Sequence, residues 1–327
     1  MTRKIGVLLT QLGTPDAPEP HAVRRFLREF LSDMRVVDVS RWLWLPLLHG
    51  VILPTRSPRS AALYQKIWRS DGVSPLLHYS QVVTHGVGQR LGQGVQVRLG
   101  MRYGQPGVAP ILHAMVAEGI RRILIVPLFP QYSSAATASI TDAVCATFGQ
   151  TRYQPALRFA SPFFDAPAYI AALAANIQAL FDSTASVDWL FSFHGLPQRF
   201  VNEGDPYADQ CVETARLLAH SLALPKQRWR VSYQSRFGRE PWLEPNTADI
   251  LARLPAEGIR RIVVVCPGFV ADCLETLEEM AVQGRETFLR AGGEQFVYLP
   301  CLNDLPVWID ALADMVQQEL AGWLEQE

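Results

Sequence analysis

One histidine and three carboxylates stand where side chains can do metal or proton chemistry. His194 ends the apolar run 189–194, so we expect its imidazole at the tip of a buried strand. There it can ligate a divalent metal or accept a proton near neutral pH. Asp272, Glu275 and Glu279 follow a second apolar run at spacings i, i+3 and i+7, which places them on one face of a helix near its N-terminal end. A line of carboxylates leading to a histidine predicts a path for a cation, or for protons leaving the site.

The chain contains a domain-sized internal repeat. Ala117–Ile123 and Ala256–Ile262 have the same sequence 139 positions apart, and each leads into an apolar run. Arg102–Gly104 matches Arg236–Gly238 at an offset of 134. A period of roughly 140 to 180 residues is far above that of solenoids and indicates a duplicated domain.

The two copies differ where the chemistry would lie. The position equivalent to His194 is Leu12, and the segment equivalent to 272–279 is the uncharged, hydroxyl-rich 131–137. The duplicated fold therefore does not itself require the histidine or the carboxylates. Two structural explanations stay open, namely a core histidine that only hydrogen-bonds its neighbours, and acidic residues that complement a helix dipole.

Apolar, β-branched runs alternate with helix-period segments in both copies, which is typical of parallel sheets covered on both faces. The expected strands are Ile5–Thr10, Val95–Met101, Ile123–Phe129, Leu157–Ala160, Trp189–Phe193, Trp229–Tyr233, Ile262–Cys266 and Phe296–Leu299. We predict an α/β fold of two duplicated Rossmann-like domains, each with a parallel sheet of about four strands flanked by helices.

The predicted domains are 1–160, then 161–305 with the candidate metal residues, and a C-terminal helix, 306–327, that packs back on the first domain. Ligands of such sheets bind beyond the carboxyl ends of the strands. The segments there are Gln11–Pro15, Arg102–Gly104, Pro130–Ser134, His194–Pro197, Gln234–Gly238 and Phe269–Glu275. We expect two facing domains to gather them around one cleft.

The first copy carries an insertion with an apolar segment at about 36–60. Its run 42–53 is interrupted by Pro46 and His49 and is shorter than the roughly 20 residues that span a bilayer. It is either a buried helix or an exposed apolar lip that suits a flat hydrophobic ligand or a membrane interface. Nearby cations that would suit carboxylates or anionic headgroups are Arg41, Arg56 and Arg59.

Composition narrows the class of protein. The chain has 30 basic and 31 acidic residues, so no net charge draws it to nucleic acid. Its 5 cysteines are odd in number and lack close ligand spacing, which argues against a disulfide framework or a structural zinc site and favours a reducing cytoplasm. The first residues show no signal-peptide pattern. We expect a cytoplasmic protein that meets the inner membrane surface peripherally through the lip.

Ordered motifs along essentially the whole chain resemble the ferrochelatase family. They are Leu12–Asp16, Phe26–Leu31, Gly72–Pro75, Met101–Gly104, Pro127–Ser133, Ser192–Pro197, Gly204–Tyr207, Tyr233–Gly238, Pro241–Leu243 and Asp272–Leu277. The resemblance implies two Rossmann-like domains around a porphyrin cleft. It also implies insertion of Fe²⁺ into protoporphyrin IX with release of two protons, the final step of haem biosynthesis.

The resemblance assigns the metal site to His194 and Glu275, with Asp272 and Glu279 as the delivery path. Which of the pair holds iron and which accepts protons stays open. The implied porphyrin contacts are Leu12, Ser74, Arg102, Tyr103, Trp242 and Phe269. The guanidinium groups of Arg102 and of the lip match propionate carboxylates. The departures from the family pattern are Gln11 in place of Asn, and Cys273 where some members have His.

We expect Fe²⁺ as substrate and no tightly bound cofactor. Some relatives hold an iron–sulfur cluster in a C-terminal extension, but no cysteine follows Cys301 here, so none is expected. One alternative is a chelatase for another tetrapyrrole, such as coproporphyrin with iron or sirohydrochlorin with cobalt. The other is a non-catalytic porphyrin-binding module. A long apolar lip favours protoporphyrin over a polycarboxylate ring, and the placement of His194 and Glu275 disfavours a module that only binds.

Overall fold

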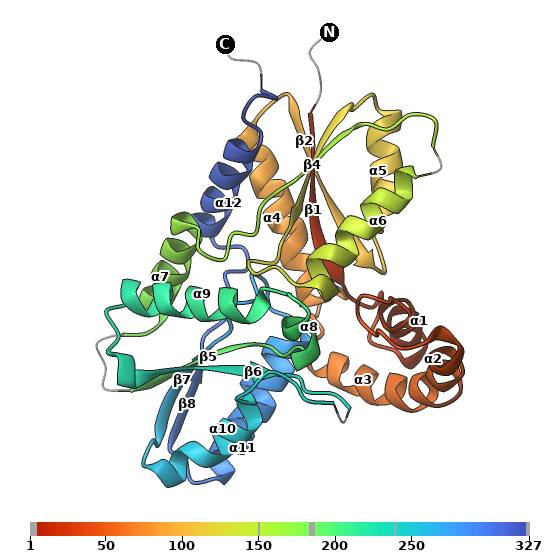
Figure 1. Ribbon diagram of the computed structural model, residues 1–327. Helices are drawn as coiled ribbons and strands as arrows, with labels where there is room; N and C mark the ends of the chain where they lie inside the picture. Colours follow the sequence, from red (N-terminus) through yellow and green to blue (C-terminus); the bar gives the residue numbers. More distant parts are fainter. Residues whose placement is uncertain (1–4, 150, 183–186, 239, 325–327) are drawn as a thin grey trace. The chain divides into compact units, whose positions relative to one another are not determined.

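The computed structural model describes residues 5–149, 151–182, 187–238 and 240–324, which form two compact units (Figure 1). One unit comprises 1–129, 133–162 and 309–327, and the other 130–132 and 163–308. Segment 130–132 groups with the second unit because the Gln131 side chain and the Tyr132 N–H donate to Thr214 and Gln210 there. Residues 1–4, which bear on the signal-peptide expectation, and the predicted helix end at 325–327 lie outside the described residues.

Both units are built on four parallel strands in the same spatial order. The first sheet, ordered β2-β1-β3-β4, consists of β1 (Ile5–Gly13), β2 (Val95–Tyr103), β3 (Arg122–Pro127) and β4 (Ala156–Phe159). The second, ordered β6-β5-β7-β8, consists of β5 (Asp188–His194), β6 (Trp229–Gln234), β7 (Arg261–Val265) and β8 (Gln295–Tyr298). The predicted fold of two duplicated Rossmann-like domains is confirmed, and each predicted strand overlaps the observed one.

The repeat extends to the backbone conformation of two pairs of glycines. Gly104 and Gly238 have φ of +77° and +73°, and Gly119 and Gly258 have φ of +91° and +87°. A residue with a Cβ rarely adopts this region, so glycine at both members of each pair maintains the same turn in each unit.

The helices of the first unit cover both faces of its sheet, with α4 on one side of β1 and α5 and α6 on the other (Figure 1). Its helices are α1 (Pro20–Leu31), α2 (Arg41–Leu47), the π-helix η1 (Leu48–Ile52), α3 (Leu53–Ile67), α4 (Pro75–Leu91), α5 (Val108–Ala117), the π-helix η2 (Ser134–Ala138) and α6 (Ser139–Phe148). Leu8, Leu112 and Ile125 are fully buried between the sheet and α5 and α6. Each such side chain contributes about 1.5–3 kcal/mol through burial.

The second unit repeats this layering, with α7 and α9 on one face of the sheet and α10, η5 and α11 on the other (Figure 1). Its helices are α7 (Pro167–Leu180), α8 (Gln198–Asn202), α9 (Tyr207–Ser221), the 3₁₀-helix η3 (Lys226–Arg228), α10 (Thr247–Arg253), the 3₁₀-helix η4 (Leu254–Glu257), the π-helix η5 (Glu275–Gly284) and α11 (Arg285–Arg290). The core under η5 contains Leu190, Val264 and Met280. Burial of this core holds η5 on the sheet.

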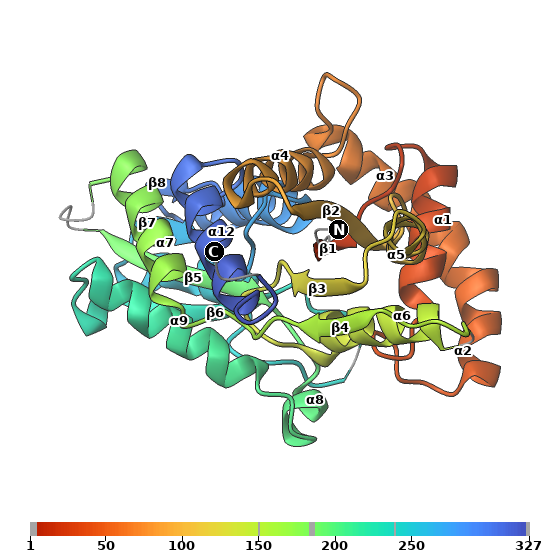
Figure 2. The ribbon, with the colours of Figure 1, turned by 90° about the horizontal axis from the view of Figure 1, so that it is seen from above.

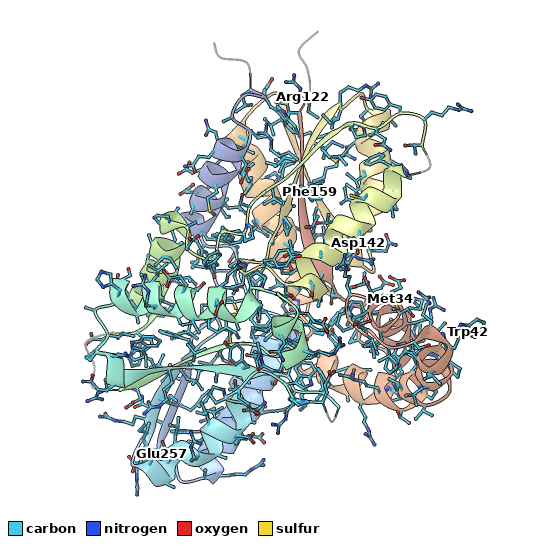
Figure 3. The ribbon with its side chains drawn as sticks, in the orientation of Figure 1. Met34, Trp42, Arg122, Asp142, Phe159 and Glu257 are labelled. Carbon is cyan, nitrogen blue, oxygen red and sulfur yellow. The ribbon has the colours of Figure 1, made fainter. Side chains whose placement is uncertain are left out.

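The last helix, α12 (Pro306–Glu319), lies beside α4 from Ile309 onward (Figure 2). A Cβ added at Gly86 of α4 would lie 2.8 Å from the Ile309 side chain, so the glycine permits close packing. Arg90 pairs with Asp310 next to this contact. The Arg122 guanidinium at the edge of the sheet donates to the Trp323 carbonyl at 3.1 Å (Figure 3). These contacts hold the end of the chain on the first unit.

The inserted apolar segment presents its outer side to solvent. No residue of α2 is buried, and Trp42 and Leu43 are 91% and 73% exposed (Figure 3). Leu48 and Leu53 face inward and are fully buried. Trp44 is half-buried, and its indole N–H donates to the Leu31 carbonyl at 2.6 Å. Of the two alternatives, the exposed lip holds for the outer side of this segment, and Trp44 anchors the segment to the fold. No helix within the described ranges is long and apolar enough to cross a membrane.

We predict that the native chain reacts with Ellman's reagent at one thiol and the denatured chain at 5, since all 5 cysteines are free and only Cys145 is exposed. Burial raises the pKa of the other thiols, which keeps them protonated and unreactive. A Cys145→Ser variant serves as control and should lose the native signal. Fewer than 5 thiols after denaturation without reductant would contradict the expected absence of disulfides.

Candidate active site

The imidazole of His194 has a defined free nitrogen. His194 is the last residue of β5 and is half-buried, and its Nδ1 lies 2.7 Å from the Gly195 carbonyl oxygen. A carbonyl only accepts hydrogen bonds, so Nδ1 carries the proton in the neutral ring. The lone pair of Nε2 is thereby available for a metal or a proton.

A tight turn after β5 places this imidazole. The N–H of Gly195 donates to the Gln234 carbonyl at 2.7 Å. A Cβ on Gly195 would lie 2.7 Å from that same oxygen and 3.1 Å from the Trp242 ring. Only glycine allows this approach, which brings the end of β5, the end of β6 and Trp242 together.

Two carboxylates stand at the start of η5, and one of them, Glu279, interacts electrostatically with His194. Glu275 and Glu279, both half-buried, stand four residues apart at the start of this π-helix. Hydrogen bonds of a π-helix span i to i+5, so residues four apart lie on the same side. Burial raises the pKa of Glu279, and the negative charge of Glu275 adds to the increase. Hydrogen bonds from Ser235, and the positive charge of His194 when that ring is protonated, oppose the increase. Glu279 therefore interacts electrostatically with both His194 and Glu275.

Asp272 does not share that helical face, so this expectation was wrong. The helical turn begins only after Cys273, and Asp272 lies in the preceding loop. Its buried carboxylate accepts hydrogen bonds from Thr276 at 2.8 Å, Tyr298 at 2.6 Å and Asn303 at 2.7 Å. These hydrogen bonds make the Asp272 carboxylate an anchor for the loop. The i, i+3 spacing would place Asp272 on the helical face only if the helix already included this residue.

Two polar residues at the end of β6 contact the carboxylate segment, and the sequence reasoning gave them no role. The Gln234 side-chain amide donates to the Glu275 carbonyl at 2.7 Å. The Ser235 N–H donates to Glu279 Oε1 at 2.7 Å, and its hydroxyl to Oε2. Their place directly after a strand, in a segment that the sequence already pointed to, was the available signal.

Trp242 and Phe269, two of the three aromatic residues expected to contact a ligand, are both half-buried. Within the described residues, the buried indole N–H of Trp242 has no hydrogen-bond partner. Its ring meets Phe237 edge-on at 6.0 Å. Phe269 is half-buried and packs partly on the core below η5. The ring of Trp242 lies against Gly195, and its orphaned indole N–H suits an acceptor on a ligand.

The other expected contacts lie at the carboxyl edge of the first sheet or in a helix cap. Leu12 is half-buried near the end of β1. Ser74 is the N-cap of α4, and its hydroxyl oxygen accepts from the Leu77 N–H at 3.2 Å. Ser74 therefore has a structural task, although its hydroxyl proton and second lone pair are still available to a ligand.

Arg102 and Tyr103 are held by a carboxylate that the sequence analysis did not single out. The Arg102 guanidinium pairs with Asp33, whose side chain is 8% exposed, and also donates to the Ser139 hydroxyl at 2.7 Å. The Tyr103 and Ser139 hydroxyls donate to the same Asp33 oxygen at 2.8 Å and 2.6 Å. Much of the charge expected to meet a propionate is thus compensated within the first unit.

Asp33 remains ionised despite its burial. Burial alone would raise its pKa, but hydrogen bonds from Ser139, the Arg35 N–H and Tyr103, with the charge of Arg102, together lower the pKa below its ordinary value. The group therefore stabilises the folded chain as a carboxylate.

Within the described ranges, no three His, Cys, Asp or Glu side chains come together as a group that could hold a metal ion. In the second unit, Glu279 instead interacts electrostatically with His194 and with Glu275. Such a set can take a borderline cation transiently or move protons.

We predict that Asp33→Asn lowers the free energy of unfolding by about 3 kcal/mol at pH 7, because it leaves the Arg102 charge buried without its partner. The folded pKa of Asp33 lies below the unfolded value, so this contribution is fully present above about pH 4 and is lost as pH falls through the folded pKa. Urea denaturation at several pH values measures it. The control is Asp142→Asn, whose ion pair with Arg35 is exposed and should matter by less than about 1 kcal/mol. Equal losses in both variants would contradict the prediction.

Comparison with known proteins identifies the family. A family model described as Ferrochelatase matches residues 4–320. The ferrochelatase of Yersinia enterocolitica serotype O:8 is 48% identical over 319 residues, covering 97% of this chain and 98% of the relative. That of Alcanivorax borkumensis is 49% identical, covering 98% and 96%.

Among solved structures, "SirB from Bacillus subtilis with Fe3+" is similar with a TM-score of 0.62 and 13% identity, covering 98% of this chain and 97% of SirB. The sirohydrochlorin chelatase SirB in complex with cobalt has a TM-score of 0.57 at 11% identity, covering 97% and 95%. At such identity the likeness shows the fold alone. The family match and relatives at nearly half identity over almost the whole length show that this chain belongs to the ferrochelatase family.

Proposed function

We propose that this chain inserts Fe²⁺ into protoporphyrin IX at a metal site formed by His194 and Glu275. Ferrochelatase activity in haem biosynthesis, a lyase reaction with Fe²⁺ as substrate, follows from its family. The observation that supports the residue assignment is the Nδ1 contact of His194 with the Gly195 carbonyl, which leaves the Nε2 lone pair available beyond a strand end, and Glu279 interacts electrostatically with both His194 and Glu275.

The chemistry asks three things of such a site. Fe²⁺ must lose water, the macrocycle must bend so that its nitrogens point at the metal, and two N–H protons must leave. An imidazole nitrogen and carboxylate oxygens can replace water on iron, and either can accept a proton. Two protein ligands hold a metal less firmly than a closed site of four, which suits a metal that is handed on.

The site has a second carboxylate, Glu279, beyond Glu275. Glu279 lies four residues beyond Glu275 and is buried enough that its charge depends on the donors of Ser235. We assign Glu279 to iron delivery or proton removal beside the pair. Asp272 is assigned to anchoring the loop instead, since three donors already occupy its carboxylate.

For the porphyrin we propose contacts residue by residue, within each unit by itself. The unpartnered indole N–H of Trp242 supports a hydrogen bond to an acceptor on the ring or its side chains. Leu12 and Phe269 offer half-buried apolar surface. Arg102 and Tyr103 would meet a propionate only as part of the Asp33 group, while Arg41 and Arg59 of the lip are exposed.

The second candidate is a chelatase for another tetrapyrrole. The fold likeness to the sirohydrochlorin chelatase SirB motivates it. The exposed apolar surface of α2 favours the vinyl-bearing, less soluble protoporphyrin over coproporphyrin or sirohydrochlorin. A non-catalytic porphyrin-binding protein would hold a porphyrin and leave it metal-free.

Anaerobic turnover of Fe²⁺ with protoporphyrin IX, followed by porphyrin absorbance and fluorescence, tests the proposal. We predict that His194→Ala and Glu275→Gln each lower kcat by at least about 100-fold, because a metal ligand or proton acceptor is lost. Coproporphyrin III, run in parallel, should be metalated more slowly. Faster metalation of coproporphyrin would favour the second candidate, and tight binding without metalation the third.

Matched controls come from the same unit. His220→Ala removes an exposed imidazole at the end of α9, and Glu286→Gln an exposed carboxylate of α11 that pairs only with Arg290 among the ion pairs found. Both variants should keep wild-type turnover. If His194→Ala or Glu275→Gln behaved like these controls, the assignment of the metal pair would be wrong.

We also propose that the protein is cytoplasmic, without an iron–sulfur cluster, and meets membranes peripherally through the lip. The support for the membrane contact is the exposure of Trp42, Leu43, Leu47 and Val51 along α2 and η1. An amphipathic element of this kind inserts its apolar side at the headgroup level. The thiol count described above bears on the cluster.

We predict that replacing Trp42 and Leu43 by Ser lowers partitioning onto phosphatidylglycerol vesicles more than about tenfold, since each buried apolar side chain contributes about 1.5–3 kcal/mol. Trp44 is left intact because its N–H bond to Leu31 supports the fold. Val212→Ser, which removes a side chain 48% exposed on α9, is the control. Equal co-sedimentation of wild type and the lip variant would remove the basis for membrane contact.

A further inference from the structure

The dipeptide Gln234–Ser235 has an unusual conformation for a buried segment. Gln234 is 1% exposed at the end of β6, and Ser235 follows with φ of +64°. A residue with a Cβ adopts this left-handed region only when its surroundings hold it there. The contacts of the dipeptide show what holds it.

Gln234 joins the strand that ends in His194 to the start of η5. It pairs with His194 in the sheet register, and its backbone carbonyl accepts the Gly195 N–H. Its side-chain oxygen accepts from the Ser192 hydroxyl at 2.8 Å, while the amide nitrogen donates to the Glu275 carbonyl at 2.7 Å. The Gln234 side chain thus fixes the position of the first residue of η5 relative to the end of β5.

Ser235 holds a carboxylate at both oxygens. Its N–H and its hydroxyl donate to the two oxygens of Glu279, so the left-handed turn aims two donors at one group. Hydrogen bonds to an ionised acceptor are shorter and stronger than neutral ones. The carboxylate cannot rotate without losing one of them.

We infer that Gln234 and Ser235 are positioning residues for the metal site, with Gln234 setting Glu275 relative to His194 and Ser235 setting the carboxylate of Glu279. This inference rests on the proposed function and deepens it. Neither side chain touches iron; Gln234 acts through Glu275, a proposed metal ligand, and Ser235 acts through Glu279, the carboxylate assigned to iron delivery or proton removal. Residues of this kind typically change metal affinity by 10- to 100-fold when they are lost.

A purely structural role would give a different result from a positioning role. Loss of a buried hydrogen bond that only stabilises the fold lowers the melting temperature and leaves the kinetic constants of the folded enzyme unchanged. Loss of a positioning residue raises KM for Fe²⁺ while KM for the porphyrin stays the same. The two roles are therefore separated by which constant moves.

The test is anaerobic turnover at varied Fe²⁺ and varied protoporphyrin IX, with thermal melting of every variant. Gln234→Met keeps the length of the side chain without its amide, and we expect KM for Fe²⁺ to rise about tenfold. The control is Asn176→Leu, which removes another buried amide, one that donates to the Pro300 carbonyl at 3.0 Å away from the site. It should lower the melting temperature without changing KM for Fe²⁺.

Ser235 offers a finer comparison. Ser235→Gly removes the hydroxyl but keeps the N–H and accommodates the positive φ, so it should fold well and still show a raised KM for Fe²⁺. Ser235→Thr keeps the hydroxyl, and although its β-branched side chain is strained at positive φ and should lower the melting temperature, the folded variant should stay closer to wild type in KM for Fe²⁺. If Ser235→Gly and Gln234→Met both kept the wild-type KM for Fe²⁺, the inference would be overturned.

Failure of this inference is distinguishable from failure of the proposed function. Wild-type turnover by His194→Ala or Glu275→Gln overturns the proposed metal pair. Loss of turnover in those variants, together with an unchanged KM for Fe²⁺ in the dipeptide variants, overturns the positioning role alone.

Discussion

Three buried or partly buried carboxylates organise the polar regions of this structure. An ionised carboxyl group in the interior is costly unless donors surround it, and each of the three draws its donors from distant parts of the chain. Asp33 binds the end of β2 and the first residue of α6, Asp272 binds residues near β8, and Glu279 binds the end of β6. Removal of either the carboxylate or its donors would leave the other without its hydrogen-bond partners, so each group is maintained as a unit. Loops that leave parallel strands would otherwise have few fixed contacts.

The duplicated fold separates what both copies share from what one copy acquired. Strand order, the left-handed glycines and a π-helix after the third strand occur in both units. In the first unit the residue equivalent to Asp272 is Ser133, whose hydroxyl caps η2 at the Ala135 N–H. In the second, a larger charged group recruits Tyr298 and Asn303. The same backbone position thus occurs in both units, and only the second unit has a charged residue there.

Predictions from the sequence were correct where the spacing of apolar residues was periodic. Alternating apolar runs and helix-period segments predicted all eight strands, and the position of His194 after a strand follows from the same pattern. The predictions failed where geometry departs from the standard periods or where partners are remote. The place of Asp272 was wrong because the helix starts later and is a π-helix, which has no signature in residue spacing. The Asp33–Arg102 pair joins residues 69 positions apart, and no local pattern reveals such a contact.

The π-helix η5 also has an evolutionary consequence. Its hydrogen bonds close wider turns than those of an α-helix, so each turn holds part of an extra residue. Loss or gain of a single residue between Glu275 and Gly284 would shift every later side chain to another face of the helix. Substitutions in this segment change one contact at a time, whereas a change of length alters all of them together. Helix α2, the part of the lip with no buried residue, is free of that constraint. Length should therefore be conserved around the carboxylates and free to drift in α2.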